Sequence, residues 1–234
     1  MSAEPLTGPD TGADGAVLRV RELLAAYAVA RPVRSIAVVG NAPLGPSRER
    51  AEAIDACDVV LRVNSFVLDT PGEPRCQGSR VTAVAFSRGT LATEFSYARY
   101  SEVAYLLTEP SRIYHDRPLA RYVKEWPRWW PDDLGYLAVP NAPFTIPLLD
   151  ALEEPWRAEV CVPTTGMMAL WIARAAFPVA RLLFTGFSMV DDPGQTTWRH
   201  QAGDVSPIGG AHHIGPEGAL MRRWIDEGEA RFLR

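Results

Sequence analysis

Short apolar runs that each stop at a small or polar residue dominate this chain. The clearest is "SIAVVG" at residues 35–40, and four more follow at intervals that leave room for helices: "DVVLRVNS", "RVTAVAFS", "EVAYLLTE" and "ARLLFTGFSM". Runs of this length without strict alternation are typical of strands buried on both faces. Strands that alternate with helices predict an α/β fold: a single doubly wound, mostly parallel sheet flanked by helices, Rossmann-like in type.

Segments with helical periodicity lie before, between and after these strands. Apolar residues recur at helical spacing over residues 17–30, and Ser47 stands near the start of a second helix. Two further helices are predicted from "GMMALWIARAAF" and from the closing "PEGALMRRWIDEGEARFL". Residues 1–15 are expected to be a disordered tail and residues 16–234 a single domain. Within it, the Pro- and Trp-rich segment 109–149 is expected to be irregular with short helices, an insertion or lid.

Composition narrows the class of protein. Of the 234 residues, 47% are apolar, which is enough for one sizeable core. The net charge of −4 offers no global positive field for nucleic acid or anionic lipid. Three cysteines stand singly, at 57, 76 and 161, so no disulfide framework is expected. Neither a long apolar run nor a signal-peptide pattern occurs, and we therefore expect a soluble cytoplasmic protein without a membrane span.

Three of the predicted strands end in residues suited to ligand binding. In parallel sheets the ligand sits at the carboxyl ends of the strands, where Gly40-Asn41, Asn64-Ser65 and Gly186-Phe187-Ser188 all fall. The first loop fits neither common phosphate pattern. Pro46 stands where a Walker loop needs lysine, and no second glycine follows as in a dinucleotide loop. Asn41 either offers its carboxamide to a ligand or caps the following turn.

Three other polar features admit a functional and a structural interpretation. Thr164, Thr165 and Gly166 precede a long helix, so they either bind an anion at its N-terminus or simply cap it. Arg62 lies in a predicted buried strand and needs a partner, more often an acidic residue such as Asp55 or Asp58 than a ligand phosphate. The acidic pair in "VDDPG" (residues 190–194) is more economically a turn than a metal site.

Histidines gather near the carboxyl terminus. Of four in the chain, His200, His212 and His213 lie between the last clear strand and the closing helix, and a neutral imidazole suits general base catalysis. The "HH" pair suggests metal ligands, but a metal site needs a third ligand at suitable spacing, and no HExxH occurs. No metal and no cofactor are therefore expected.

Taken in order, these pieces resemble the sialyltransferases of glycosyltransferase family 29. The large motif of that family is similar to "IAVVGNAPLGPSRERAEAIDACDVVLRVNSF" continued by "GSRVT", and the small motif to "VPTTGMMALWIARAAFPVARLLFTGFSM". The third motif resembles "TWRHQ", and the very short H-x4-E motif matches "HHIGPE" through His212 and Glu217. The resemblance covers residues 35–82 and 161–220 and implies a variant of the GT-A type of fold.

The resemblance implies a metal-independent, inverting transfer of a sugar from a CMP-activated donor to an acceptor hydroxyl. The sugar would be of the sialic or related ulosonic acid type. His212 would be the general base and His200 the donor to the leaving phosphate, with Glu217 and His213 in support. The nucleotide side would be formed by Gly40, Asn41, Asn64, Ser65, Thr164, Thr165, Gly166, Gly186 and Phe187.

The chain departs from the family at several positions. Ile36 stands where the first cysteine of the family's disulfide would be, and Gln201 replaces the aromatic residue after the third-motif histidine. These departures indicate a minimal, soluble, bacterial relative. "HH" leaves open which histidine is the base, although H-x4-E favours His212. The acceptor side must come mostly from segment 109–149, with these aromatic and imidazole candidates: Tyr114, His115, Trp126, Trp129 and Trp130.

Two alternatives remain from the sequence. The same CMP-type pocket could serve a nucleotide or nucleotide-sugar hydrolase, or a transferase of a nucleoside natural-product pathway. A non-catalytic nucleotide-binding module fits less well, because it leaves the histidine pair without a role.

Overall fold

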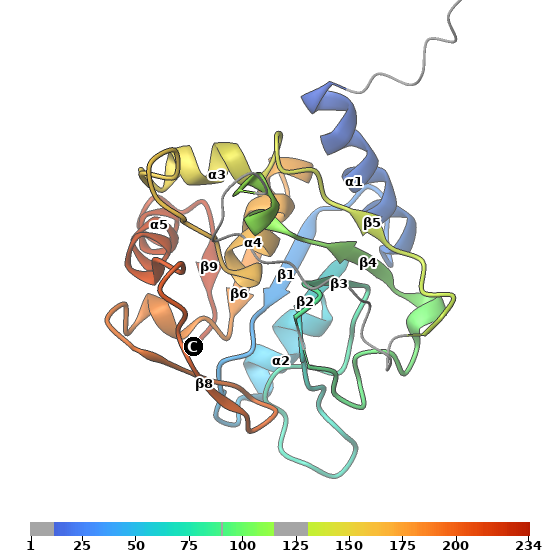
Figure 1. Cartoon of the computed structure of the whole chain (residues 1–234). Helices are drawn as coiled ribbons and strands as arrows, with labels where there is room; N and C mark the ends of the chain where they lie inside the picture. Colours follow the sequence, from blue (N-terminus) through green and yellow to red (C-terminus); the bar gives the residue numbers. More distant parts are fainter. Residues whose placement is uncertain (1–11, 90, 115–130) are drawn as a thin grey trace, which may run out of the picture.

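A seven-stranded parallel sheet forms the centre of the molecule (Figure 1). The computed structural model describes residues 12–89, 91–114 and 131–234. Every hydrogen-bonded pair in this sheet is parallel, in the order β5-β4-β3-β2-β1-β6-β9. The strands are β1 (Ser35–Val39), β2 (Val59–Val63), β3 (Ala83–Phe86), β4 (Ala104–Leu107), β5 (Leu137–Ala138), β6 (Arg181–Thr185) and β9 (Arg231–Phe232). The predicted fold class is confirmed.

Helices cover both faces of this sheet. They are α1 (Ala13–Tyr27), α2 (Arg48–Asp55), α3 (Thr145–Ala151), α4 (Thr165–Ala176) and α5 (Ile214–Asp226), with short 3-10 turns at Tyr100–Glu102, Pro110–Tyr114 and Ser188–Val190. A separate two-stranded antiparallel hairpin pairs β7 (Thr197–Arg199) with β8 (Val205–Pro207). Among the described residues, no helix is both long and apolar enough to cross a bilayer.

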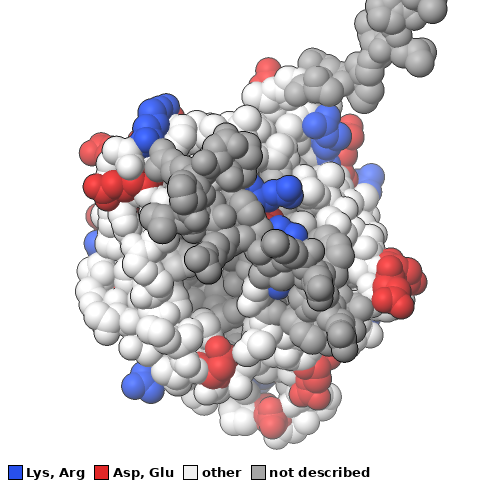
Figure 2. All heavy atoms as spheres, in the orientation of Figure 1, with Lys and Arg blue, Asp and Glu red and all other residues white. Residues whose placement is uncertain are grey.

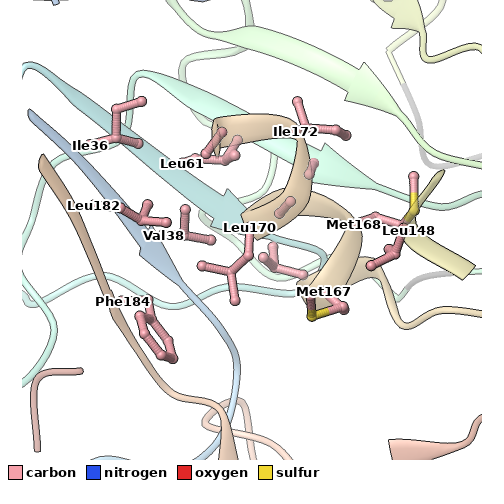
Figure 3. Close-up of a cluster of buried hydrophobic side chains, with 14 of the residues drawn as sticks. Ile36, Val38, Leu61, Leu148, Met167, Met168, Leu170, Ile172, Leu182 and Phe184 are labelled. Atoms are coloured by element: carbon pink, nitrogen blue, oxygen red, sulfur yellow. The ribbon is translucent and has the colours of Figure 1, made fainter. Parts of the chain in front are cut away.

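The apolar runs of the sequence are explained by burial from two sides. β1 and β2 are buried along their whole length, because successive side chains point to opposite faces of the sheet and helices pack on both faces. Val38 and Leu61 pack under α4, where Leu170 and Met167 lie over them (Figure 3). On the other face Val39 and Val60 pack with Ile54 of α2. Burying each such aliphatic side chain contributes about 1.5–3 kcal/mol to folding.

Two predicted helix boundaries are wrong. α1 begins at Ala13, so the last residues of the predicted tail belong to a helix. The closing helix ends at Asp226, and Gly228, at φ 73°, turns the chain into β9, which pairs with β6. Strands as short as β9 carry no periodicity of their own, and only pairing defines them.

Segment 109–149 is also more regular than expected. It supplies β5, which extends the sheet beside β4, and α3, whose Leu148 lies beside Met168 of α4 (Figure 3). The described part of this segment therefore belongs to the core rather than to a lid alone. Residues 115–130 lie outside the described residues.

The strand order reverses between β1 and β6. The chain runs outward from β1 to β5 on one side, then returns to place β6 and β9 on the other side of β1. The loops that leave β1 and β6 therefore diverge and open a crevice at the carboxyl edge of the sheet, the position where α/β sheets bind ligands.

Candidate active site at the carboxyl edge of the sheet

A cavity of about 540 Å³ lies at this switch point. Its volume is in the range of small-ligand sites. The structure brings together there all of the residues predicted to bind the nucleotide and both predicted catalytic histidines: Gly40, Asn41, Asn64, Ser65, Thr164, Thr165, Gly166, Gly186, Phe187, His200 and His212. Glu217 and His213 do not line it.

The loops after β1 and β6 are in backbone contact at two glycines, Gly40 and Gly186. Gly40 donates to Thr185 O at 2.9 Å, and Ala42 donates to Gly186 O at 3.0 Å. A Cβ atom on Gly40 would overlap the carbonyl of Gly186, and one on Gly186, at φ 75°, would overlap that of Gly40. The sequence interpretation, that Gly40 lets the backbone approach a ligand, therefore misses its main constraint, which is this contact between backbones.

Asn41 keeps an unused acceptor. Its Oδ1 is buried and has no hydrogen-bond partner among the described residues, while its backbone oxygen accepts from Gln201 N at 2.7 Å. The capping role belongs to Ser47, whose hydroxyl accepts from Arg50 N at the start of α2. The capping alternative for Asn41 is thus wrong. A buried amide oxygen without a partner is costly unless a ligand or water satisfies it.

The loop after β2 is held from within the protein. Asn64 adopts φ 49°, and its Oδ1 accepts from Ser87 N at 3.3 Å, which links the ends of β2 and β3. Ser65 donates its hydroxyl to Leu91 O. Both residues line the cavity. The protein itself holds both side chains, whereas Asn41 Oδ1 has no hydrogen-bond partner among the described residues.

Helix α4 points its N-terminus at the cavity. Thr164 is the N-cap, and its hydroxyl accepts from Met167 N at 3.1 Å. No described residue accepts a hydrogen bond from the amides of Thr165 and Gly166, which both line the cavity. A Cβ atom on Gly166 would meet the ring of Phe187 at 2.7 Å, so this glycine lets the ring pack. Open N-terminal amides on a helix form an anion site.

Glu217 lies directly behind this N-terminus. Its carboxylate accepts from Thr164 N at 2.8 Å and from the Thr164 hydroxyl at 2.6 Å, and the residue is 1% exposed. Burial raises the pKa of Glu217 to about 7, against the effect of the two Thr164 hydrogen bonds. Glu217 therefore positions the start of α4 through α5 and does not itself reach the cavity.

His212 has a fixed tautomer in its neutral form. Its Nδ1 lies 2.7 Å from Val162 O. A carbonyl can only accept, so Nδ1 carries the proton and Nε2 keeps its lone pair. Since His212 lines the cavity, the ring has the arrangement that a general base requires.

The neighbouring histidine serves a different part of the molecule. His213 Nδ1 lies 2.6 Å from Glu154 Oε2, and His213 does not line the cavity. Of the two histidines that the sequence left open, His212 is the one placed beside the candidate ligand space.

His200 forms a dyad with an aspartate that the sequence analysis did not nominate. Its Nδ1 lies 2.6 Å from Asp204 Oδ2, across the tight turn that joins β7 to β8. This bond orients the ring and leaves Nε2 available to a ligand. Gln201 anchors the same turn, because it accepts from Leu44 N at 2.8 Å through its side chain. The hairpin thereby closes over the loop after β1.

Of the predicted acceptor residues, Tyr114 alone is among the described residues. Tyr114 is 2% exposed, donates to Cys161 O at 2.8 Å and accepts from Cys161 N at 3.0 Å, so it is a structural residue outside the cavity. The remaining candidates lie outside the described residues: His115, Trp126, Trp129 and Trp130.

Two charged features considered as ligand groups also lie outside the cavity. Arg62 is fully buried and donates to three carbonyls, those of Gln77, Gly78 and Arg80, at 2.8–3.2 Å. Burial lowers its pKa to about 10. Backbone carbonyls thus hold Arg62 in place of the acidic partner expected from the sequence. Asp191 follows a 3-10 turn and accepts from Arg234 at 3.0 Å.

Several cavity residues were missed by the sequence analysis. They follow β3 and β4 or belong to the hairpin: Ser87, Thr108, Glu109, Trp198, Asp204 and Ser206. The rule that ligands meet strand ends covers the first three, since "AFS" and "LLTE" end predicted strands. Asp204 carried no signal beyond its spacing from His200.

On the visible face, positive and negative side chains are scattered without a continuous patch of either sign (Figure 2).

The fold is that of known sialyltransferases. The crystal structure of a mammalian sialyltransferase matches with a TM-score of 0.57 at 17% identity, over 98% of this chain and 81% of that one. A mammalian sialyltransferase in complex with Gal-beta-1-3GalNAc-ortho-nitrophenol matches with a TM-score of 0.56 at 18% identity, over 97% and 80%. No family model matches the sequence. No curated protein matches it significantly. The chain therefore has a sialyltransferase-like fold.

Proposed function

We propose that this protein is an inverting glycosyltransferase that moves a sugar of the sialic or related ulosonic acid type from a CMP-activated donor to an acceptor hydroxyl. The observation that carries the proposal is the position of His212. Its Nδ1 is hydrogen-bonded to Val162 O. His212 also lines the same cavity as the N-terminus of α4 and as Asn41, whose Oδ1 has no partner among the described residues. The sialyltransferase-like fold supports the same class of reaction.

In this mechanism the cavity holds the donor with its phosphate toward the positive end of α4. The amides of Thr165 and Gly166 would bind the phosphate oxygens, and Asn41 Oδ1 would accept from an N–H or O–H of the nucleoside. Because these donors are built into the protein, the leaving phosphate needs no metal ion for stabilisation.

The transfer itself is a single displacement. His212 Nε2 takes the proton of the acceptor hydroxyl while the acceptor oxygen forms a bond to the anomeric carbon. The bond from that carbon to the phosphate oxygen breaks, and its electron pair leaves with CMP. A protonated His200, oriented by Asp204, donates Nε2–H to the leaving phosphate.

The direct test is the release of CMP from activated sugars. Release that requires an acceptor, and that is abolished in His212→Ala while CMP still binds, supports the transferase. If CMP neither binds nor is released, and another nucleotide binds in its place, the donor assignment is wrong.

Hydrolysis is the second candidate. The observation in its favour is the burial of Tyr114, the one described member of the predicted acceptor set. If water replaces the acceptor, CMP release proceeds at the same rate with and without acceptor, and free sugar is the product.

A further inference from the structure

A cluster of three metal-ligating side chains lies behind His212. It consists of Glu154, Cys161 and His213, and their potential ligand atoms all lie within 4.8 Å of one another. None of the three lines the cavity. In the sequence the histidine pair lacks a further metal ligand at suitable spacing, and the fold supplies two from the segment that precedes α4.

The carboxylate of this cluster is incompletely satisfied. The Glu154 side chain is 5% exposed, and only its Oε2 has a described partner, His213 Nδ1 at 2.6 Å. Its Oε1 is buried and has no hydrogen-bond partner among the described residues. A buried carboxylate oxygen without a donor is costly, and a bound cation removes that cost.

The remaining ligands suit a transition metal. Cys161 is 1% exposed, and its backbone is held on both sides by the hydroxyl of Tyr114. The side chain of His213 is 32% exposed, so water can reach this side of the cluster. A thiolate, an imidazole and a carboxylate are the ligand types of zinc, and three protein ligands with one open position are a common zinc arrangement.

We propose that Glu154, Cys161 and His213 bind a single divalent transition metal ion, zinc above all, with water as its fourth ligand. In a tetrahedral zinc site, bond lengths of about 2.0–2.3 Å place ligand atoms roughly 3.5 Å apart. Ligand atoms as far apart as 4.8 Å must therefore close by about 1 Å, whereas Glu154 Oε2 and His213 Nδ1, 2.6 Å apart, must separate by about 1 Å. Binding releases the Cys161 thiol proton and replaces the Glu154–His213 hydrogen bond.

The site has a structural consequence for the cavity. Cys161 and His213 are the immediate neighbours of Val162 and His212, which form the hydrogen bond that fixes the tautomer of His212. A metal that joins Cys161 to His213 fastens these two backbone segments together. It acts outside the cavity, and the inference does not depend on the proposed transfer reaction.

The test is metal binding by the chelator-treated, full-length protein. We expect one equivalent of Zn²⁺ to bind, and we expect Co²⁺ to bind in its place with a thiolate-to-cobalt charge-transfer band. Cys161→Ser should abolish that band and weaken Zn²⁺ binding by about tenfold or more. Cys76→Ser is the matched control, since Cys76 lies outside the cluster, and it should bind like the wild type.

A second variant keeps the test decisive if Cys161→Ser fails to fold. His213→Gln changes a partly exposed side chain and should also weaken Zn²⁺ binding by about tenfold or more. Absence of stoichiometric binding, or binding that Cys161→Ser and His213→Gln leave unchanged, would mean that the cluster is only an ion pair beside a thiol. CMP binding, measured on the same samples, reports separately on the proposed function.

Discussion

Two walls of the cavity differ in the chemistry that they offer. The strand-end wall is formed by Asn41, Asn64, Ser65 and Ser87, which follow β1, β2 and β3 and are all neutral. The histidine wall is formed by Thr165, Gly166, His200 and His212, which come from the start of α4, the hairpin and the segment before α5. Both imidazoles and the N-terminus of α4 lie on this second wall. The first wall is thus suited to recognition and the second to charge and proton transfer.

The largest effect is expected from His212→Ala, which removes the base from the histidine wall. Turnover should fall by about 10²–10⁴-fold, because proton abstraction by a positioned side chain contributes that much. CMP binding, measured by calorimetry, should be nearly unchanged. Loss of CMP binding together with turnover would assign His212 to donor binding. The distinction between a recognition wall and a proton-transfer wall would then be wrong.

His200→Ala should show a different pattern on the same wall. We expect weaker binding of CMP as well as slower release, because His200 Nε2 is proposed to contact the phosphate. An unchanged affinity and rate would leave the His200–Asp204 dyad as a support of the hairpin only.

Gly40→Ala tests whether the strand-end wall depends on the contact between backbones. A Cβ atom there overlaps the Gly186 carbonyl, so we expect a loss of about 3 kcal/mol in the free energy of unfolding in urea. Gly45→Ala is the matched control. It lies in the same loop with no atom within 4 Å of its Cβ position, and should change stability by less than about 0.5 kcal/mol.

Glu217→Gln should change how stability depends on pH. The pKa of Glu217 is raised from 4.5 to about 7 in the folded protein, so its stabilising effect is complete below pH 4.5 and is lost as pH rises through 7. Relative to the wild type, the variant should therefore gain about 2–3 kcal/mol between pH 5 and pH 8. Urea unfolding in the presence of chelator measures this difference, and a constant difference would contradict the raised pKa.

The smallest effect is expected from Asn41→Ala. CMP affinity should fall by about 1–2 kcal/mol, while the free energy of unfolding should not fall, because Oδ1 makes no bond to the described protein. Asn64→Ala should do the opposite and lose stability, since Asn64 combines φ 49° with the bond to Ser87 N. If both variants lose only stability, the strand-end wall binds no nucleotide.

The sequence by itself determined the order of the main strands and helices and the places where polar residues meet the ends of strands. It could do so because burial from both faces produces continuous apolar runs, and because parallel strands align their carboxyl ends. Asn41, Asn64 and Gly186 were therefore found from local pattern alone. Where the pattern was only two residues long, as in β5 and β9, it carried no information.

Only the tertiary structure decided what each side chain contacts. Gly40 is fixed by Gly186, and His213 by Glu154, partners that are far away in the chain and have no common motif. Tyr114 was expected at the acceptor side and instead holds Cys161, because hydrogen bonding and burial act between segments that sequence spacing does not relate. The strand-end wall of the cavity follows from the strand pattern. The partners behind them, including the cluster of Glu154, Cys161 and His213, follow from packing.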